Sequence, residues 1–188
     1  MSDARPDYRT FVDAFDPAVL TDALHGDLVD GVNACVECCD RHAGHDRVAL
    51  LWGDAAGRRA TFTFDELQAR SAQVANLLVD HGVQPGDRVS GLLPRVPELV
   101  ALILGVWRAG AVNHPLFTAF GPQAIEQRLT TSQAKVVVTD ADNRSKLDGV
   151  SNAPVVMTLG GGGDDVDFTS SVDARPSTFE PVLRSGDD

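Results

Sequence analysis

From residue 60 onward, short apolar runs alternate with longer stretches in which apolar residues recur every three or four positions. The short runs predict four strands, at RVSGLLP, AVNHPLF, AKVVVTD and NAPVVMTL, and the longer stretches predict helices between them. Strands joined through single helices make right-handed crossovers and lie parallel in one sheet. The pattern therefore predicts an α/β fold with a mainly parallel sheet and covering helices.

The predicted helices carry start and stop signals. Thr63 and Glu66 have capping-box spacing, and Gly82 stands where a helix-ending glycine belongs. Pro97 begins the next helix, within PELVALILGVWRAG, and Gly110 can end it. A shorter third helix is predicted in GPQAIEQRLTTS.

The helix that begins at Pro97 has no clearly polar face. No residue between Glu98 and Arg108 is charged, and a helix that is apolar all round is buried on every side. The predicted elements are too few to cover it, so we expect a second copy, or sequence absent from this chain, to pack there. The chain alone should then expose an apolar surface and self-associate through it.

Four consecutive glycines occur in the run VVMTLGGGGDD. A phosphate-binding loop needs backbone N–H groups aimed at the anion, usually with a helix N-terminus or a lysine behind them. Here Asp164, Asp165 and Asp167 follow the glycines and would repel an anion. A hairpin turn or a linker is therefore favoured over a phosphate site.

Composition indicates a globular protein and argues against nucleic-acid binding. Hydrophobic residues make up 43% of the 188 residues, and 27 acidic against 16 basic residues give a net charge of −11. The N-terminus lacks the basic-then-apolar pattern of a secretory signal. The longest apolar run, Leu99–Trp107, is too short to span a bilayer. We expect a cytoplasmic protein without a membrane span.

Three cysteines and two histidines occur together in CVECCDRHAGH, namely Cys35, Cys38, Cys39, His42 and His45. Their offsets would place all five on one broad helix face, and thiolates with imidazoles suit zinc. Structural zinc sites usually take ligands from two separated segments, and no second segment exists here. Buried free thiols in a reducing compartment are therefore favoured over a metal site.

The ordered set of segments resembles the N-terminal part of the AMP-forming acyl-CoA synthetases, in the branch that includes acetyl-CoA synthetase. The resemblance is carried by FTFDEL, GVQPGDRV, LPRVPELV, WRAGAV, PLFTAFGPQAIEQRL and KVVVTD, with NACVECCDRH upstream. It covers residues 30–150, roughly. It implies the N-terminal subdomain of the adenylate-forming ligase fold.

The resemblance also implies an activity. Family members activate a small carboxylic acid with ATP and Mg²⁺, release pyrophosphate, and pass the acyl group from AMP to coenzyme A. Their Ser/Thr/Gly-rich phosphate loop and catalytic lysine do not occur in this sequence. We therefore expect an arm (1–30), an α/β subdomain (31–159) and a Gly/Asp-rich linker (160–188) leading to a missing phosphate-loop region.

Three interpretations of the function remain open. The chain is an N-terminal synthetase fragment that is inactive alone, a stand-alone nucleotide- or CoA-binding module without catalysis, or an interaction fragment that completes a synthetase supplied by another chain. The first is favoured, with no catalytic residue in this chain. The acyl substrate is not indicated, because the family builds its acid pocket largely from later segments.

The resemblance implies candidate coenzyme-binding residues on two loops. Phe117, Thr118 and Ala119 correspond to a turn beside the CoA nucleotide, although relatives often have two glycines where Thr118 and Ala119 stand here. Arg144 and Lys146 follow the third predicted strand, and a similarly placed arginine in that branch meets a CoA phosphate. The alternative is that Arg144 and Lys146 are solvated loop charges.

Overall fold

The computed structural model describes residues 7–151 and 154–187. Its main sheet has five parallel strands in the order β4-β3-β5-β6-β7. They are β3 (Arg88–Leu92), β4 (Val112–Pro115), β5 (Val136–Thr139), β6 (Val155–Thr158) and β7 (Val166–Asp167). The predicted α/β class and parallel sheet are confirmed, with β7 as an additional short strand.

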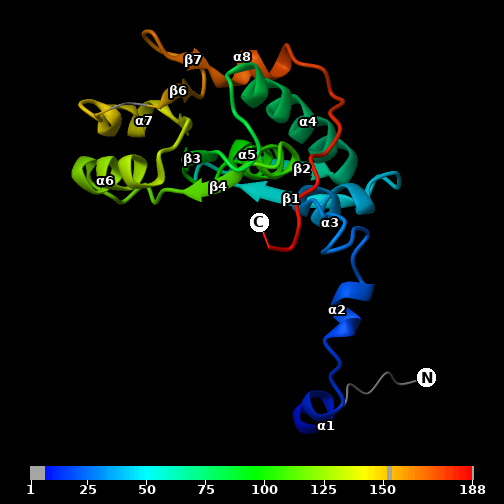
Figure 1. The fold of residues 1–188 in the computed structure, drawn as a ribbon. Coiled ribbons are helices and arrows are strands. Elements are labelled where there is room, and N and C mark those ends of the chain that lie inside the picture. The colour runs from blue at the N-terminus through cyan, green and yellow to red at the C-terminus, as the bar shows by residue number, and fades with distance from the viewer. Residues whose placement is uncertain (1–6, 152–153, 188) are drawn as a thin grey trace.

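Helices pack on both faces of this sheet (Figure 1). One face carries α4 (Phe64–Asp80), α5 (Pro97–Arg108) and α8 (Phe168–Asp173), and the other carries α6 (Pro122–Ser132) with the 3-10 turn η2 (Ser145–Leu147). Side chains alternate along β5 to fill both cores. Val136 and Val138 join the α4–α5–α8 cluster, whereas Val137 joins the α6 cluster.

The local helix signals act as the sequence predicts. The Thr63 side chain accepts a hydrogen bond from the Glu66 backbone N–H, and the Glu66 carboxylate accepts one from the Thr63 N–H. Pro97 occupies the first turn of α5, where its missing N–H leaves no hydrogen bond unmade. Gly82 follows α4 with a φ of 80°, a conformation that favours glycine.

The covering of α5 differs from the expectation. Every residue of α5 is buried or half-buried, and the cover comes from this chain itself. Elements preceding α4 supply it: α3 (Ala34–Cys38) and an antiparallel hairpin of β1 (Val48–Gly53) and β2 (Arg59–Thr63). The expectation that a second copy or absent sequence must cover α5 is wrong, because the hairpin was not predicted.

Helices α4 and α5 approach each other closely at a glycine. A Cβ built on Gly105 would lie 2.5 Å from side-chain atoms of Val74, closer than two carbon atoms can pack. The absence of a side chain at Gly105 therefore lets α4 and α5 pack in contact across one turn. Among the helices of the described residues, none combines the length and apolarity that crossing a membrane requires.

An exposed apolar surface lies on the N-terminal arm instead. The short helices α1 (Tyr8–Asp13) and α2 (Ala18–Asp22) extend away from the body of the molecule and bury no residue (Figure 1). The large apolar side chains exposed on this arm are Tyr8, Phe11, Val12, Phe15, Val19, Leu20, Leu28 and Val29. Self-association through an exposed apolar surface stays a prediction.

The segment expected to be a linker contains regular structure. It includes β7 and α8, and Phe168 and Val172 of α8 are buried in the main core. Further on, Arg184 pairs with Val32 through two backbone hydrogen bonds of 2.8 and 2.9 Å. The division of the chain at residues 30 and 159 stays a prediction, but the last segment packs against the same body as the rest.

A buried arginine joins the N-terminal elements to the helices. Arg108, at the end of α5, is 3% exposed, and its Nη2 donates to Asp40 Oδ1 at 2.5 Å in the 3-10 turn η1 (Asp40–His42). Its Nε donates to Ser71 Oγ on α4 at 2.9 Å, and Nη2 also lies 3.4 Å from Cys35 Sγ. A buried guanidinium requires such partners, because removing one leaves an uncompensated charge.

Replacement of Asp40 by alanine should therefore destabilise the fold strongly. We expect Asp40→Ala to lower the free energy of unfolding in urea by roughly 3–5 kcal/mol, since Arg108 would stay buried without its counter-ion. Asp54→Ala is the matched control, because its partner Arg58 is 76% exposed. That control should change stability by less than about 1 kcal/mol. Equal effects of the two substitutions would contradict the role assigned to Asp40.

Candidate functional site

The strand order changes direction at β3. Strand β4 lies on one side of β3, and β5, the next strand in sequence, lies on the other. In doubly wound sheets, ligands bind outside the carboxyl ends of the strands at such a switch point. The loops that follow β4 and β5 both lie at this edge, and they carry the two groups of candidate residues.

Lys146 joins these two loops. Its Nζ donates to the backbone carbonyl of Thr118 at 2.5 Å and to Asn143 Oδ1 at 2.7 Å. Lys146 is therefore a structural contact between the loops rather than a solvated charge. The structure brings Thr118 and Lys146 together, although they are distant in sequence, and Asn143 is a partner that sequence reasoning missed.

The loop after β4 presents an aromatic surface. Phe117 is 64% exposed and lies edge-on to Phe120, with 5.8 Å between ring centroids. Phe120 packs against the α6 cluster and receives the Arg128 guanidinium 4.1 Å from its ring centroid. Ala119 is exposed beside them. An exposed ring held by a fixed neighbour can stack against a planar ligand group.

Arg144 is held by two carboxylates. Its Nε donates to Asp165 Oδ2 at 2.5 Å, its Nη2 donates to Asp165 Oδ1 at 3.0 Å, and its Nη1 donates to Asp148 Oδ1 at 2.9 Å. The hydrogen bond between Arg144 and Asp165 lowers the pKa of the aspartate and raises that of the arginine. Sequence reasoning did not identify Asp165 as the partner of Arg144, because in the sequence Asp165 is only one of several acidic residues after the glycines.

A cleft of about 440 Å³ opens beside Arg144. Helix α7 (Ala141–Arg144) and the glycine run form its walls. The lining residues are Ala141, Arg144, Ser145, Asp148, Thr158, Gly161, Gly162, Gly163, Asp164 and Asp165. The glycines form a turn closed by an isolated antiparallel bridge between Gly162 and Asp165, as the sequence favoured. The flanking strands β6 and β7 are parallel, so the turn does not join a β-hairpin.

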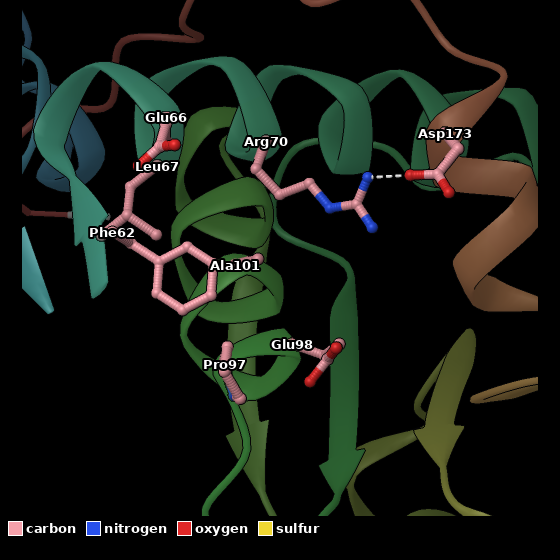
Figure 2. Close-up of a pocket in the computed structure, with 8 residues that line it drawn as sticks. All are labelled: Phe62, Glu66, Leu67, Arg70, Pro97, Glu98, Ala101 and Asp173. Carbon is pink, nitrogen blue, oxygen red and sulfur yellow. Dashed lines mark hydrogen bonds and ion pairs between the residues drawn. The ribbon is translucent and has the colours of Figure 1, made fainter. Parts of the chain in front are cut away.

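Figure 2 shows a second cavity, of about 300 Å³, between the first turns of α4 and α5 and the end of α8. Four apolar residues and four charged ones line it: Phe62, Leu67, Pro97, Ala101, Glu66, Arg70, Glu98 and Asp173. Arg70 is paired with Asp173, and Glu66 takes part in the helix cap. The three carboxylates and one arginine make this cavity a poor place for an anion.

His114, near the end of β4, forms a polar cluster with two serines. Its Nδ1 lies 2.8 Å from Ser90 Oγ and 3.4 Å from Ser132 Oγ. Burial, followed by the charge of Arg128, lowers the pKa of His114. Because Ser90 is fully buried, its hydroxyl is inaccessible to a substrate, and we assign the cluster a structural role.

The cysteine segment packs differently from its expected form. Cys35 and Cys39 are buried against Leu67 and Leu104, but Cys38 is exposed, so the expectation of three buried thiols is wrong for Cys38. The ring of His42 packs against Phe64 instead, with 5.1 Å between the ring centroids. Across the described ranges, no group of three or more His, Cys, Asp or Glu side chains converges as a metal site.

Comparisons with known proteins identify the family. A family model described as AMP-binding enzyme matches residues 37–184, and the chain belongs to this family. Acetyl-coenzyme A synthetase of Bacillus subtilis is 40% identical over 136 residues, which cover 69% of this chain and 24% of that protein. The enzyme of that name from Mycobacterium tuberculosis is 40% identical over 112 residues, covering 57% of this chain and 17% of the relative.

Solved structures agree with this assignment. A crystal structure of Brucella canis acyl-CoA synthetase is 50% identical, with a TM-score of 0.92, and the match covers 96% of this chain and 34% of that one. ATP-bound MatB from Rhodopseudomonas palustris is 29% identical, with a TM-score of 0.69. The chain thus corresponds to the N-terminal part of an acyl-CoA synthetase and spans about a third or less of the length of these relatives.

The thiols give a direct test of the packing of α3. We expect one thiol, Cys38, to react rapidly with a disulfide reagent in the folded protein, and Cys35 and Cys39 to react only after denaturant is added. Counting modified thiols over time by absorbance gives the result. Cys38→Ser should remove the rapid phase, and its persistence in that variant would contradict this placement of α3.

Proposed function

We propose that this chain supplies the N-terminal portion of an AMP-forming acyl-CoA synthetase and part of its coenzyme A site. The observation that carries the proposal is the junction at the carboxyl edge of the sheet, where Lys146 holds the Thr118 carbonyl at 2.5 Å. This contact places the exposed Phe117 ring and the Arg144 guanidinium on neighbouring loops. Family membership and the acetyl-CoA synthetase relatives support the choice of coenzyme.

Each residue has a distinct task in this proposal. Phe117 offers its exposed ring to the adenine of CoA, and the backbone at Thr118 and Ala119 lines the approach to it. Arg144 binds a CoA phosphate, because a planar guanidinium matches two phosphate oxygens at once. Lys146 holds the two loops in register and is a positioning residue. These side chains bind and orient CoA and take no part in bond making.

The complete reaction of such a synthetase has two steps. A carboxylate oxygen attacks the α-phosphorus of ATP, which gives an acyl-adenylate and releases pyrophosphate. The CoA thiol then attacks the acyl carbon and releases AMP. We propose that ATP, Mg²⁺ and the carboxylic acid are held by the portion that the relatives contain and this chain lacks, and that this chain alone is catalytically inactive.

A stand-alone CoA-binding module without catalysis is the alternative. One observation favours it: α5 is covered by this chain's own α3 and β1–β2 hairpin, so the core around it is closed without further sequence. Both versions use the same CoA site and differ in whether another polypeptide segment completes it. The three free cysteines suit a cytoplasmic location, where thiols stay reduced.

The proposal of inactivity has a simple kinetic test. The purified 188-residue chain should show no carboxylate-dependent exchange of pyrophosphate into ATP, because it contains neither the family's phosphate loop nor its catalytic lysine. Acetate and longer fatty acids are supplied in turn, with an intact acetyl-CoA synthetase as positive control. Exchange that survives repurification and exceeds the no-enzyme background would show that the chain is itself a catalyst.

CoA binding is tested by calorimetry on the same chain. Arg144→Gln should weaken CoA binding about tenfold, because a charge-assisted contact to phosphate is lost. Arg58→Gln makes the same charge change at a site 76% exposed on the β1–β2 hairpin and should leave the affinity unchanged. Pantetheine, which lacks the phosphates, should not distinguish the variants. Equal CoA affinity in wild type and Arg144→Gln would refute the proposed phosphate contact.

A further inference from the structure

We infer that Asp165 is an internal competitor for the phosphate site at Arg144, held there by the glycine turn until an anionic ligand displaces it. The inference rests on the proposed function, in which Arg144 binds a phosphate of CoA. It adds a residue that sets the affinity of this site. It also assigns a task to the glycine run, which the proposed function leaves without one.

The geometry of the ion pair is that of a bound anion. Asp165 presents both carboxylate oxygens to the Nε–Nη2 edge of Arg144, at 2.5 and 3.0 Å. This edge is one of the two that can receive two oxygens of a phosphate in bidentate binding, the other being the Nη1–Nη2 end. Asp148 occupies the remaining Nη1 at 2.9 Å. A phosphate can therefore reach the guanidinium edge only if a carboxylate leaves it.

Asp165 rather than Asp148 occupies the binding position. The Asp165 side chain is 7% exposed and lies between Arg144 and Thr158, whose hydroxyl donates to Asp165 Oδ2 at 2.7 Å. The Asp148 side chain is 72% exposed, at the outer side of the same guanidinium. Removing the charge of Asp165 thus frees the buried edge, whereas removing that of Asp148 changes only the solvated side.

The charges around the cleft also indicate that Asp165 must leave Arg144 before a phosphate can bind. One arginine, Arg144, faces three carboxylates, Asp148, Asp164 and Asp165, in the lining of the cleft. The hydrogen bond from Arg144 lowers the pKa of Asp165, so its carboxylate stays ionised at neutral pH. A phosphate that enters the cleft while Asp165 is in place would meet a net negative charge. Departure of Asp165 removes the nearest carboxylate and leaves the guanidinium to the phosphate.

The glycine turn can release Asp165 at low steric cost. All four glycines have positive φ values, of 78°, 72°, 154° and 59° for Gly160 to Gly163, and glycine also tolerates the alternative conformations that opening requires. A Cβ at Gly160, Gly162 or Gly163 would meet no atom within 4 Å, so the turn is not packed against the body at these positions. The Asp165 carboxylate forms the side-chain hydrogen bonds from this segment to Arg144 and Thr158.

A purely structural role for Asp165 makes a different prediction. If the carboxylate only fixes the glycine turn, its neutralisation lowers stability and leaves ligand affinity unchanged or weaker. Competition requires that neutralisation strengthens binding, and that the gain depends on Arg144. The direction of the affinity change therefore separates the two roles.

The test is calorimetry of CoA and of adenosine 3′,5′-bisphosphate on the 188-residue chain. Asp165→Asn keeps the side-chain size and should bind both probes about tenfold more tightly than wild type. Asp148→Asn, the matched control on the exposed side of the same guanidinium, should change the affinity less than threefold, roughly, because that contact is solvated. The double variant Asp165→Asn with Arg144→Gln should bind no more tightly than Arg144→Gln alone.

Amide hydrogen exchange provides a second readout, in which the wild-type chain is compared with and without CoA. CoA added to the wild-type chain should accelerate exchange of the segment 160–165, because Asp165 leaves Arg144 when the ligand binds. In Asp165→Asn this segment should exchange rapidly with or without CoA. Slower exchange of the segment on CoA binding to wild type would overturn the competition.

The outcomes separate this inference from the proposed function. If Arg144→Gln weakens binding but Asp165→Asn does not strengthen it, the CoA site stands and Asp165 is structural. If Arg144→Gln has no effect and Asp165→Asn still binds the probes no more tightly than wild type, both fail. If Asp165→Asn binds adenosine 3′,5′-bisphosphate more tightly than wild type but does not bind CoA more tightly, Asp165 does compete with a phosphate at Arg144. The proposal that this phosphate belongs to CoA is then overturned.

Discussion

The buried guanidinium of Arg108 takes its polar partners from three separate elements of the fold. It ends the apolar helix α5, and its counter-ion Asp40 comes from the N-terminal segment, with Ser71 of α4 as a further partner. Nearby, the Asn33 amide donates to the backbone carbonyls of Trp107 and Arg108 and to that of Val182. The segments that contain Asn33, Asp40 and Val182 are therefore joined to the two central helices by polar groups. These groups would lose their hydrogen bonds if the segments separated.

This arrangement fixes the frame on which the candidate site lies. Helix α5 connects β3 to β4, and its position therefore sets the edge where the loops after β4 and β5 meet (Figure 1). At that edge polar contacts add to the packing of the α6 core: Lys146 holds one loop and Asp165 holds Arg144.

Helix α5 is covered within this chain, although the chain spans only part of the length of its relatives. An apolar helix in a protein that spans a third or less of its relatives suggests missing cover, but α3 and the β1–β2 hairpin provide it here. Exposed apolar side chains occur on the arm formed by α1 and α2, which extends away from the sheet, and also at scattered positions on the body. Helix α5 is therefore buried by residues of this chain.

Local patterns by themselves determined the central helices, four strands of the sheet and the parallel arrangement, because capping and hydrophobic periodicity are expressed within a few residues of one another. Tertiary structure alone decided the rest. Strand β7 has two residues, too few for a periodic pattern, and Cys38 is exposed because the orientation of α3 depends on what covers it. Asp165 binds Arg144 from 21 residues away, and such a pairing exists only once parallel strands bring separate loops to the same edge of the sheet.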